Sequence, residues 1–179
     1  MKIETKGADG KATGYLVPIW NALENPELRP EQVYLTVVGP GAVKGPHLHK
    51  VRRGVFRCIK GNVRIVVRRM DGVYQAFMSG EAYDYAPVIV MPGIPAAIYN
   101  IDGNQEAFVL NMPAPAWSKE SPDEWPVEGW DASRIFDVDK ILRLVNATEN
   151  ERQAAERFYV EYGFSVNRAV YALQSALSI

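Results

Sequence analysis

The chain contains two histidines, His47 and His49, separated by a single residue. In an extended segment alternate side chains point to the same face, so both imidazoles can face one interior. Imidazole titrates near neutral pH, which suits it to proton transfer or to metal binding. A catalytic first-row metal usually takes at least three protein ligands, and the first acidic residue after the pair is Asp71. The pair therefore favours proton transfer over metal binding, and the plain alternative is a pair of structural or surface histidines.

Basic residues crowd the stretch around the histidines, and no acidic residue interrupts them: Lys44, Lys50, Arg52, Arg53, Arg57, Lys60, Arg64, Arg68 and Arg69. The formal net charge is only −1, so the rest of the chain is correspondingly acidic. A local positive field would attract an anionic ligand such as a diphosphate. Lys44, Arg52 and Arg53 are the candidates for that contact, whereas Arg64 and Arg68 alternate with apolar residues and indicate a solvated sheet face.

Aromatic side chains offer further contacts to a base or a sugar, although most aromatic residues simply pack in cores. The candidates for such stacking are Tyr15, Tyr34, Tyr99 and Trp117. The single cysteine, Cys58, lies within a predicted strand and is expected to be a core residue. One cysteine cannot form an internal disulfide, so we expect a reducing, cytoplasmic setting. No phosphate-binding loop, dinucleotide-binding fingerprint or nucleophile-elbow motif is present.

These residues must be positioned by short strands, because apolar runs before residue 113 are separated by Gly, Pro, Asn and Asp. The predicted strands cover residues 14–20, 31–38, 54–59, 63–67, 73–78, 87–91, 97–101 and 106–112. Lys60-Gly61-Asn62 and Asp71-Gly72 are predicted to be hairpin turns. Strands at roughly ten-residue spacing are typical of an antiparallel sandwich or barrel.

Residues 1–130 are predicted to form this barrel, with residues 113–130 packed as a loop on its surface or over its mouth. Residues 131–179 contain no proline and repeat apolar residues at helical spacing, which predicts a C-terminal helical extension. The near-neutral charge gives no sign of nucleic-acid or anionic-membrane binding. No apolar stretch is long enough for a transmembrane helix, and the N-terminus lacks an apolar signal region.

The segment 40–50, PGAVKGPHLHK, resembles the cupins that act on nucleotide-linked 4-keto sugars, the dTDP-4-dehydrorhamnose 3,5-epimerase-like family. Shorter segments at 30–34, 56–63, 91–95, 109–113 and 122–124 continue the resemblance in the same order, over about residues 10–130. The resemblance implies a mainly β fold, a cupin double-stranded β-helix of the jelly-roll type, here with the C-terminal α-helical extension. It also implies a nucleotide-sugar substrate, a homodimer and chemistry that needs no organic cofactor.

Within this resemblance, His47 matches the catalytic base of the 3,5-epimerases. His49 matches the second histidine of the related 3,4-ketoisomerases, where the epimerases usually carry glutamine. Lys44 stands where the epimerases carry an arginine near the diphosphate. The resemblance thus assigns the histidine pair to proton transfer and Lys44 to substrate binding.

Three positions depart from the family pattern. Gly54 stands where metal cupins place glutamate and epimerases often place lysine, and Ala96 stands where a histidine is common. Trp117 replaces the tyrosine that serves as general acid in the epimerases. An indole N–H donates a hydrogen bond but cannot protonate a carbanion at neutral pH, so the usual two-sided epimerase mechanism lacks its acid here.

We therefore expect an isomerase or epimerase of a nucleotide-linked 4-keto-6-deoxy sugar that works by histidine-mediated proton transfer beside the carbonyl. His47 would be the base, His49 would move the proton or orient the sugar, and Tyr34 or Tyr99 would give a hydroxyl to the enolate. The substrate would be bound by Lys44, Arg52, Arg53 and Trp117, with no metal. The alternatives are a cupin that binds a sugar nucleotide or another anionic small molecule without turnover, and a metal-dependent cupin enzyme.

Overall fold

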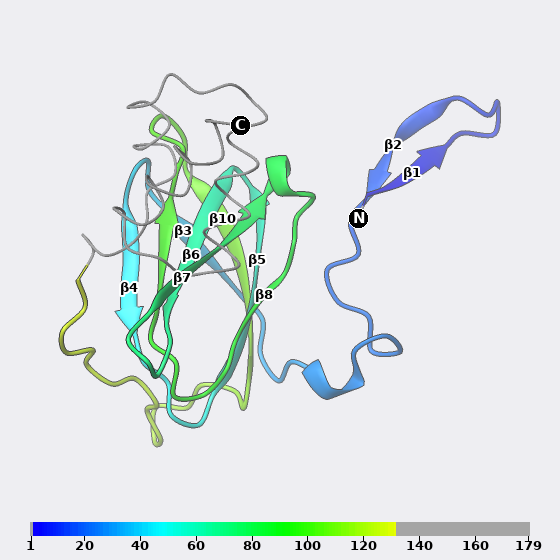
Figure 1. The fold of residues 1–179 in the computed structure, drawn as a ribbon. Coiled ribbons are helices and arrows are strands. Elements are labelled where there is room, and N and C mark those ends of the chain that lie inside the picture. The colour runs from blue at the N-terminus through cyan, green and yellow to red at the C-terminus, as the bar shows by residue number, and fades with distance from the viewer. Residues whose placement is uncertain (1, 132–179) are drawn as a thin grey trace, which may run out of the picture.

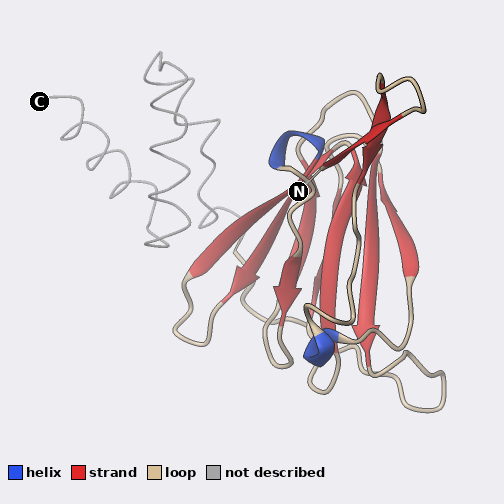
Figure 2. Ribbon diagram, turned by 90° about the vertical axis from the view of Figure 1, so that its right-hand side faces the viewer, coloured by secondary structure: helices blue, strands red, loops and turns tan. Residues whose placement is uncertain are grey.

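The computed structural model describes residues 2–131, so the helical extension predicted from residue 131 onward lies outside the described residues apart from its first residue. Two four-stranded antiparallel sheets face each other and form a barrel (Figures 1 and 2). In the described part of the chain, no helix is long and apolar enough to cross a membrane.

The first sheet has the strand order β3-β10-β5-β8, formed by Tyr34–Val38, Ala107–Ala114, Arg53–Lys60 and Val88–Val90. The second has the order β4-β9-β6-β7, formed by Val43–His47, Ala96–Asn100, Asn62–Arg68 and Tyr74–Gly80. Strands that follow each other in the chain often lie in opposite sheets, as β3 and β4 do. This crossing between sheets is characteristic of a jelly roll.

An N-terminal hairpin, β1 (Ile3–Lys6) and β2 (Ala12–Leu16), stands apart from the two sheets (Figure 1). The hydroxyls of Tyr15 and Tyr85 share a 2.9 Å hydrogen bond that ties this hairpin to the loop after the 3-10 helix η2 (Glu81–Tyr83). A second short helix, η1 (Pro26–Leu28), lies between the hairpin and β3. The two sheets therefore form the body of the described structure, and the hairpin is an appendage to it.

The strand predictions are confirmed in outline, and four details differ. The Asp71-Gly72 turn joins β6 to its hairpin partner β7, and Gly72 adopts a positive φ of 80°. The predicted hairpin at Lys60-Gly61-Asn62 is wrong, because β5 and β6 do not pair and the turn passes the chain from one sheet to the other. β1 and β4 were not predicted as strands, and the strand expected at 14–20 is β2, which ends at Leu16.

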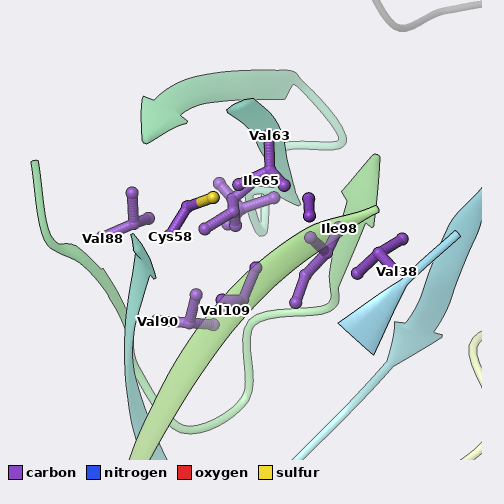
Figure 3. Packing of buried hydrophobic residues seen from close by; sticks show 10 residues of the cluster. Val38, Cys58, Val63, Ile65, Val88, Val90, Ile98 and Val109 are labelled. Carbon is purple, nitrogen blue, oxygen red and sulfur yellow. The ribbon is translucent and has the colours of Figure 1, made fainter. Parts of the chain in front are cut away.

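The core fills one end of the space between the sheets. Figure 3 shows Val38, Cys58, Val63, Ile65, Ile98 and Val109 meeting there from five strands. Full burial of a Val or Ile side chain contributes about 1.5–3 kcal/mol, so this end gives the barrel much of its stability. Burial raises the pKa of the Cys58 thiol to about 11, and the residue belongs to the core.

On two strands, β3 and β10, inward-facing positions change from apolar to polar toward the other end of the barrel. On β3 the inward residues run from Val38 in the core to Thr36 and Tyr34 on a cavity wall. On β10 they run from Val109 in the core to Asn111 on the same wall. Because strand side chains alternate, each strand contributes both to the packed core and to the cavity beside it.

Candidate functional site

The end of the barrel that carries Tyr34 and Asn111 holds a cavity with both polar and apolar walls, and its empty volume, including solvent at the mouth, is about 820 Å³. Both sheets line it, together with the turn after β4 and the segment that follows β10. Five of the residues predicted for the site lie on its wall: Tyr34, Lys44, His47, His49 and Arg52. The structure thus brings together residues from two strands and an adjoining turn.

The segment after β10, residues 115–131, forms a strap along the barrel. Trp125 of the strap donates its backbone N–H to the Leu48 carbonyl at 2.9 Å, which places this segment beside the two histidines. Farther along, Arg68 on β6 donates to the Glu128 carbonyl at 2.7 Å, so the strap then reaches the second sheet. The strap therefore places the side chain of Glu124 on the cavity wall.

His47 ends β4 and is paired with an acidic residue of the strap. Its Nδ1 lies 2.6 Å from Oε1 of Glu124, and the two side chains are 46% and 54% exposed. A carboxylate at Nδ1 holds the proton on that nitrogen and leaves Nε2 with a free lone pair. It also stabilises the imidazolium that forms when Nε2 accepts a proton. His47 is therefore placed to act as a general base.

His49 has a different environment, although its ring lies nearly parallel to that of His47, with the centroids 6.5 Å apart. Its Nδ1 donates to the backbone carbonyl of Asp123, so Nε2 is left as the acceptor. Arg52, which is only 6% exposed, places Nη2 3.0 Å from Nδ1 and 3.3 Å from Nε2, and of these two nitrogens Nε2 has the lone pair that can accept from it. Burial lowers the pKa of His49, the Asp123 carbonyl opposes the shift, and the charge of Arg52 adds to it. His49 is thus a neutral ring with both nitrogens engaged by the protein, so neither nitrogen is open to remove a substrate proton.

Asp123 holds the turn that carries His49 and Arg52. Its carboxylate accepts backbone N–H groups from Lys50 at 2.9 Å, Val51 at 3.0 Å and Arg52 at 2.7 Å. Partial burial of the carboxylate raises its pKa, but these hydrogen bonds outweigh burial and lower the pKa to about 2. The strap and the turn are therefore locked together while Asp123 is ionised.

Tyr34 and Asn111 form one row across the first sheet. They are direct neighbours in the β3–β10 register, and Asn111 Nδ2 donates to the Tyr34 hydroxyl at 2.5 Å. Burial raises the pKa of Tyr34, the charge of Arg52 lowers it and that of Glu124 raises it. Tyr34 therefore keeps its proton at neutral pH and can donate it in a hydrogen bond inside the cavity.

Three residues predicted for the site lie elsewhere. Tyr99 alternates with the inward-facing Ile98 on β9 and accepts a hydrogen bond from Trp130 Nε1 at 3.3 Å. Arg53 donates to the carbonyl of Glu27 at 2.7 Å and so anchors the η1 segment. Trp117 is 48% exposed on the strap and does not line the cavity. The alternation of strand side chains separates Tyr99 from the cavity, and Trp117 lies too early in the strap to reach it.

The structure adds three residues that spacing in the sequence did not single out as site residues: Asn111, Asp123 and Glu124. Asp123 and Glu124 contact partners more than 70 residues earlier in the chain, so no local pattern connects them to the histidines. Asn111 left a weak signal, because it is a polar residue within the apolar run of a predicted strand. In the described range, residues 2–131, no three His, Cys, Asp or Glu side chains are grouped so that they could hold a metal ion.

Known proteins with a similar fold are found among solved structures. No protein-family model and no curated protein sequence matches the chain. Among solved structures, it is similar to a dTDP sugar isomerase from Desulfovibrio desulfuricans, with a TM-score of 0.59, 18% identity and coverage of 72% of this chain and 82% of that one. The dTDP-6-deoxy-D-glucose-3,5-epimerase of Legionella pneumophila, solved with dTDP-4-keto-L-rhamnose, has a TM-score of 0.57 and 15% identity, with coverage of 73% and 79%.

The barrel has the cupin fold. The same barrel is found in the capsular polysaccharide assembling protein CapF of Staphylococcus aureus, with a TM-score of 0.51 and 20% identity. That match covers 55% of this chain and only 29% of CapF, so the chain spans less than a third of that protein. The predicted fold class is confirmed, and the shared fold is that of sugar-nucleotide epimerases and isomerases.

Proposed function

We propose that this cupin is an enzyme that isomerises or epimerises a nucleotide-linked 4-keto-6-deoxy sugar. The observation that carries the proposal is the 2.6 Å contact between His47 Nδ1 and Glu124 Oε1 on the wall of the cavity. The solved cupins with similar folds include a dTDP sugar isomerase and a 3,5-epimerase. A ketone acidifies the adjacent C–H bond, and a histidine paired with a carboxylate is a suitable base for that proton.

The reaction would begin when His47 Nε2 removes the proton from the carbon beside the ketone. The electron pair of the broken C–H bond forms a carbon–carbon double bond, and the carbonyl π electrons move to oxygen to give an enolate. The Tyr34 hydroxyl donates to that oxygen, while Glu124 stabilises the imidazolium of His47. Protonation of the same carbon on its other face by a solvent proton gives the epimer, and His47 releases the proton it removed. For the isomer, the hydroxyl on the carbon that lost its proton transfers its hydrogen to the enolate oxygen, and His47 returns the removed proton to the former carbonyl carbon.

Lys44 is the cation that would contact the diphosphate. Arg52 also lines the cavity, but its guanidinium is buried and engaged with His49. We therefore assign Arg52 to positioning His49 and the sugar, and leave the diphosphate to Lys44. Arg53 and Trp117 have no place in this proposal, because neither lies on the cavity wall.

Proton exchange tests the function directly. The protein is incubated with dTDP-4-keto-6-deoxyglucose in deuterated water, and deuterium on the sugar ring is followed by NMR. We expect exchange beside the ketone above the rate without protein, and its loss in His47→Ala. Tyr99→Phe is the control, because that hydroxyl lies on the other side of β9, where it contacts the strap. Binding of the sugar without any exchange would mean that the protein is a nucleotide-sugar binder without turnover.

We also propose that two copies of the chain associate. The outer side of β3 and the residue before it expose Val33, Leu35 and Val37, and β3 is an edge strand of its sheet. Edge strands with exposed apolar residues are prone to pair with another chain. Light scattering after size exclusion should give twice the chain mass of 20.0 kDa, and Leu35→Lys should halve it. The cytoplasmic location expected from the single cysteine stays a prediction.

A further inference from the structure

The second sheet, β4-β9-β6-β7, buries side chains on the face that points away from the first sheet. Val66 lies between two core residues of β6, and its strand partners Ala97 and Ala76 each lie beside an inward-facing residue of β9 or β7. Because strand side chains alternate, these three residues, the outer row, point outward. They are nevertheless at most 2% exposed. The alternation of Arg64 and Arg68 with apolar residues predicted a solvated face here, which the burial of Val66 contradicts.

The outer face of the first sheet is more open. Its edge strands β3 and β8 carry the outward-facing residues Leu35, Val37 and Ile89, which are between 38% and 47% exposed. The edge strand β7 of the second sheet differs, because its outward-facing residues Tyr74 and Ala76 are at most 3% exposed. An edge strand has a neighbouring strand on one side only. Burial to this degree therefore requires a further part of the chain to lie on the outer face.

The end of the strap lies on this face. The ring of Trp130 meets the ring of Tyr74 edge-on, with the centroids 5.0 Å apart, and its Nε1 donates to the Tyr99 hydroxyl. The backbone N–H of Asp131, the last described residue, donates to the Tyr74 hydroxyl at 2.6 Å. The outer row spans three strands, about 10 Å at the usual strand spacing, so one indole covers only part of it. The chain that continues from Asp131 thus starts beside the outer row.

The sequence of that continuation contains apolar residues suited to such a face. One apolar stripe at helical spacing is formed by Val138, Ile141, Leu142 and Val145. An apolar stripe of this kind is normally buried against another element. The outer row consists of small side chains, which leave room for the larger ones of a stripe. The continuation therefore matches the face in both chemistry and size.

We propose that residues 132–179 dock on the outer face of the second sheet and cover the outer row. The occupant is the same chain because the strap already ends on this face, at Asp131. A segment tethered in this way has an effective concentration of about millimolar, which favours it over a second copy of the protein. The outer face of the second sheet is then an interface within the chain, whereas the outer side of β3 remains available to another copy.

Photo-crosslinking in the full chain tests this proposal. Benzoylphenylalanine replaces Met78, which is the outward-facing partner of Arg64 beside the outer row and is partly exposed. In a mixture of 15N-labelled and unlabelled protein, we expect mass spectrometry to find crosslinks from position 78 to peptides of residues 132–179 within one chain. The same replacement at Leu35 is the control, and it should give no crosslink to those peptides. Crosslinks from position 78 that stay within residues 2–131, or that join two chains, would overturn the proposal.

Ala76→Glu gives a second test, because it would place a carboxylate without a partner in the buried outer row. We expect trypsin to cut at Arg143 and Arg152 roughly 10-fold faster than in the parent protein, since cleavage follows the population of the open form. Met70→Glu is the control, because it adds the same charge at a residue that is 95% exposed and should leave cleavage unchanged. A melting curve verifies the fold of each variant. Unchanged cleavage in folded Ala76→Glu overturns the proposal, and if this variant does not fold the crosslinks decide.

Discussion

The pairing of His47 with Glu124 makes a quantitative prediction for Glu124→Gln. The substitution keeps the size and shape of the side chain and removes its charge, so the imidazolium formed during the reaction loses its counter-ion. At about 4 Å between charge centres, the attraction is about 1 kcal/mol in water and about 4 kcal/mol at an effective dielectric constant of 20. Both side chains are about half exposed, so we take an intermediate value of about 2 kcal/mol.

A loss of about 2 kcal/mol in the transition state slows the reaction roughly 30-fold. The assay is the rate of deuterium incorporation into dTDP-4-keto-6-deoxyglucose at saturating sugar, with the dissociation constant measured separately. We expect the rate to fall and the dissociation constant to change less than about twofold, because Glu124 acts on the charge that develops and not on the bound ketone. Glu128→Gln is the control, since Glu128 is exposed on the same strap and uses only its backbone carbonyl to bind Arg68. An exchange rate within threefold of the parent protein would refute the assignment of Glu124.

Three further predictions follow from other contacts. Tyr34→Phe should slow exchange roughly 100-fold, the effect of removing one donor to a developing oxyanion, and equal rates would exclude that role. Asp123 has a folded pKa of about 2, below its ordinary 3.8. Its ionised carboxylate therefore stabilises the fold above pH 3.8, and this stabilisation is lost as the pH falls from 3.8 toward 2. The free energy of unfolding of Asp123→Asn, measured by denaturation at several pH values, should not show this loss, which is about 1 kcal/mol after solvent screening. Arg53→Ala should lower the free energy of unfolding by about 1–2 kcal/mol and leave exchange unchanged, since Arg53 anchors the η1 segment; a large loss of exchange would place it in the site after all.

Local sequence patterns predicted the strands that are bounded by clear turn residues. The β6–β7 hairpin follows from Asp71-Gly72, because Gly72 can take the positive φ that this turn requires. Gly61 also has a positive φ, yet its turn joins two sheets and not two paired strands. A glycine turn fixes the local bend, but which strands pair is decided by packing across the whole barrel.

The cavity residues that lie close together in the sequence were predictable, because a local pattern connects them. His47, His49 and Arg52 lie within six residues of each other, and the alternation of an extended segment brings both histidines to one side. Glu124 was out of reach, because only the path of the strap brings it to His47. Tyr99 shows the converse case: its residue type suited the chemistry, but the register of β9 turns Ile98 rather than Tyr99 toward the cavity.

The strap also explains why two histidines so close in sequence have different chemistry. Its adjacent residues Asp123 and Glu124 contact different partners: the carboxylate of Glu124 binds His47, and the backbone carbonyl of Asp123 binds His49. His47 thus faces a carboxylate, whereas His49 faces a neutral carbonyl and the cation of Arg52. Burial is the main cause that lowers the pKa of His49, and the charge of Arg52 adds to it. This asymmetry leaves the role of the base to His47, while His49 holds the strap and Arg52 in place beside it.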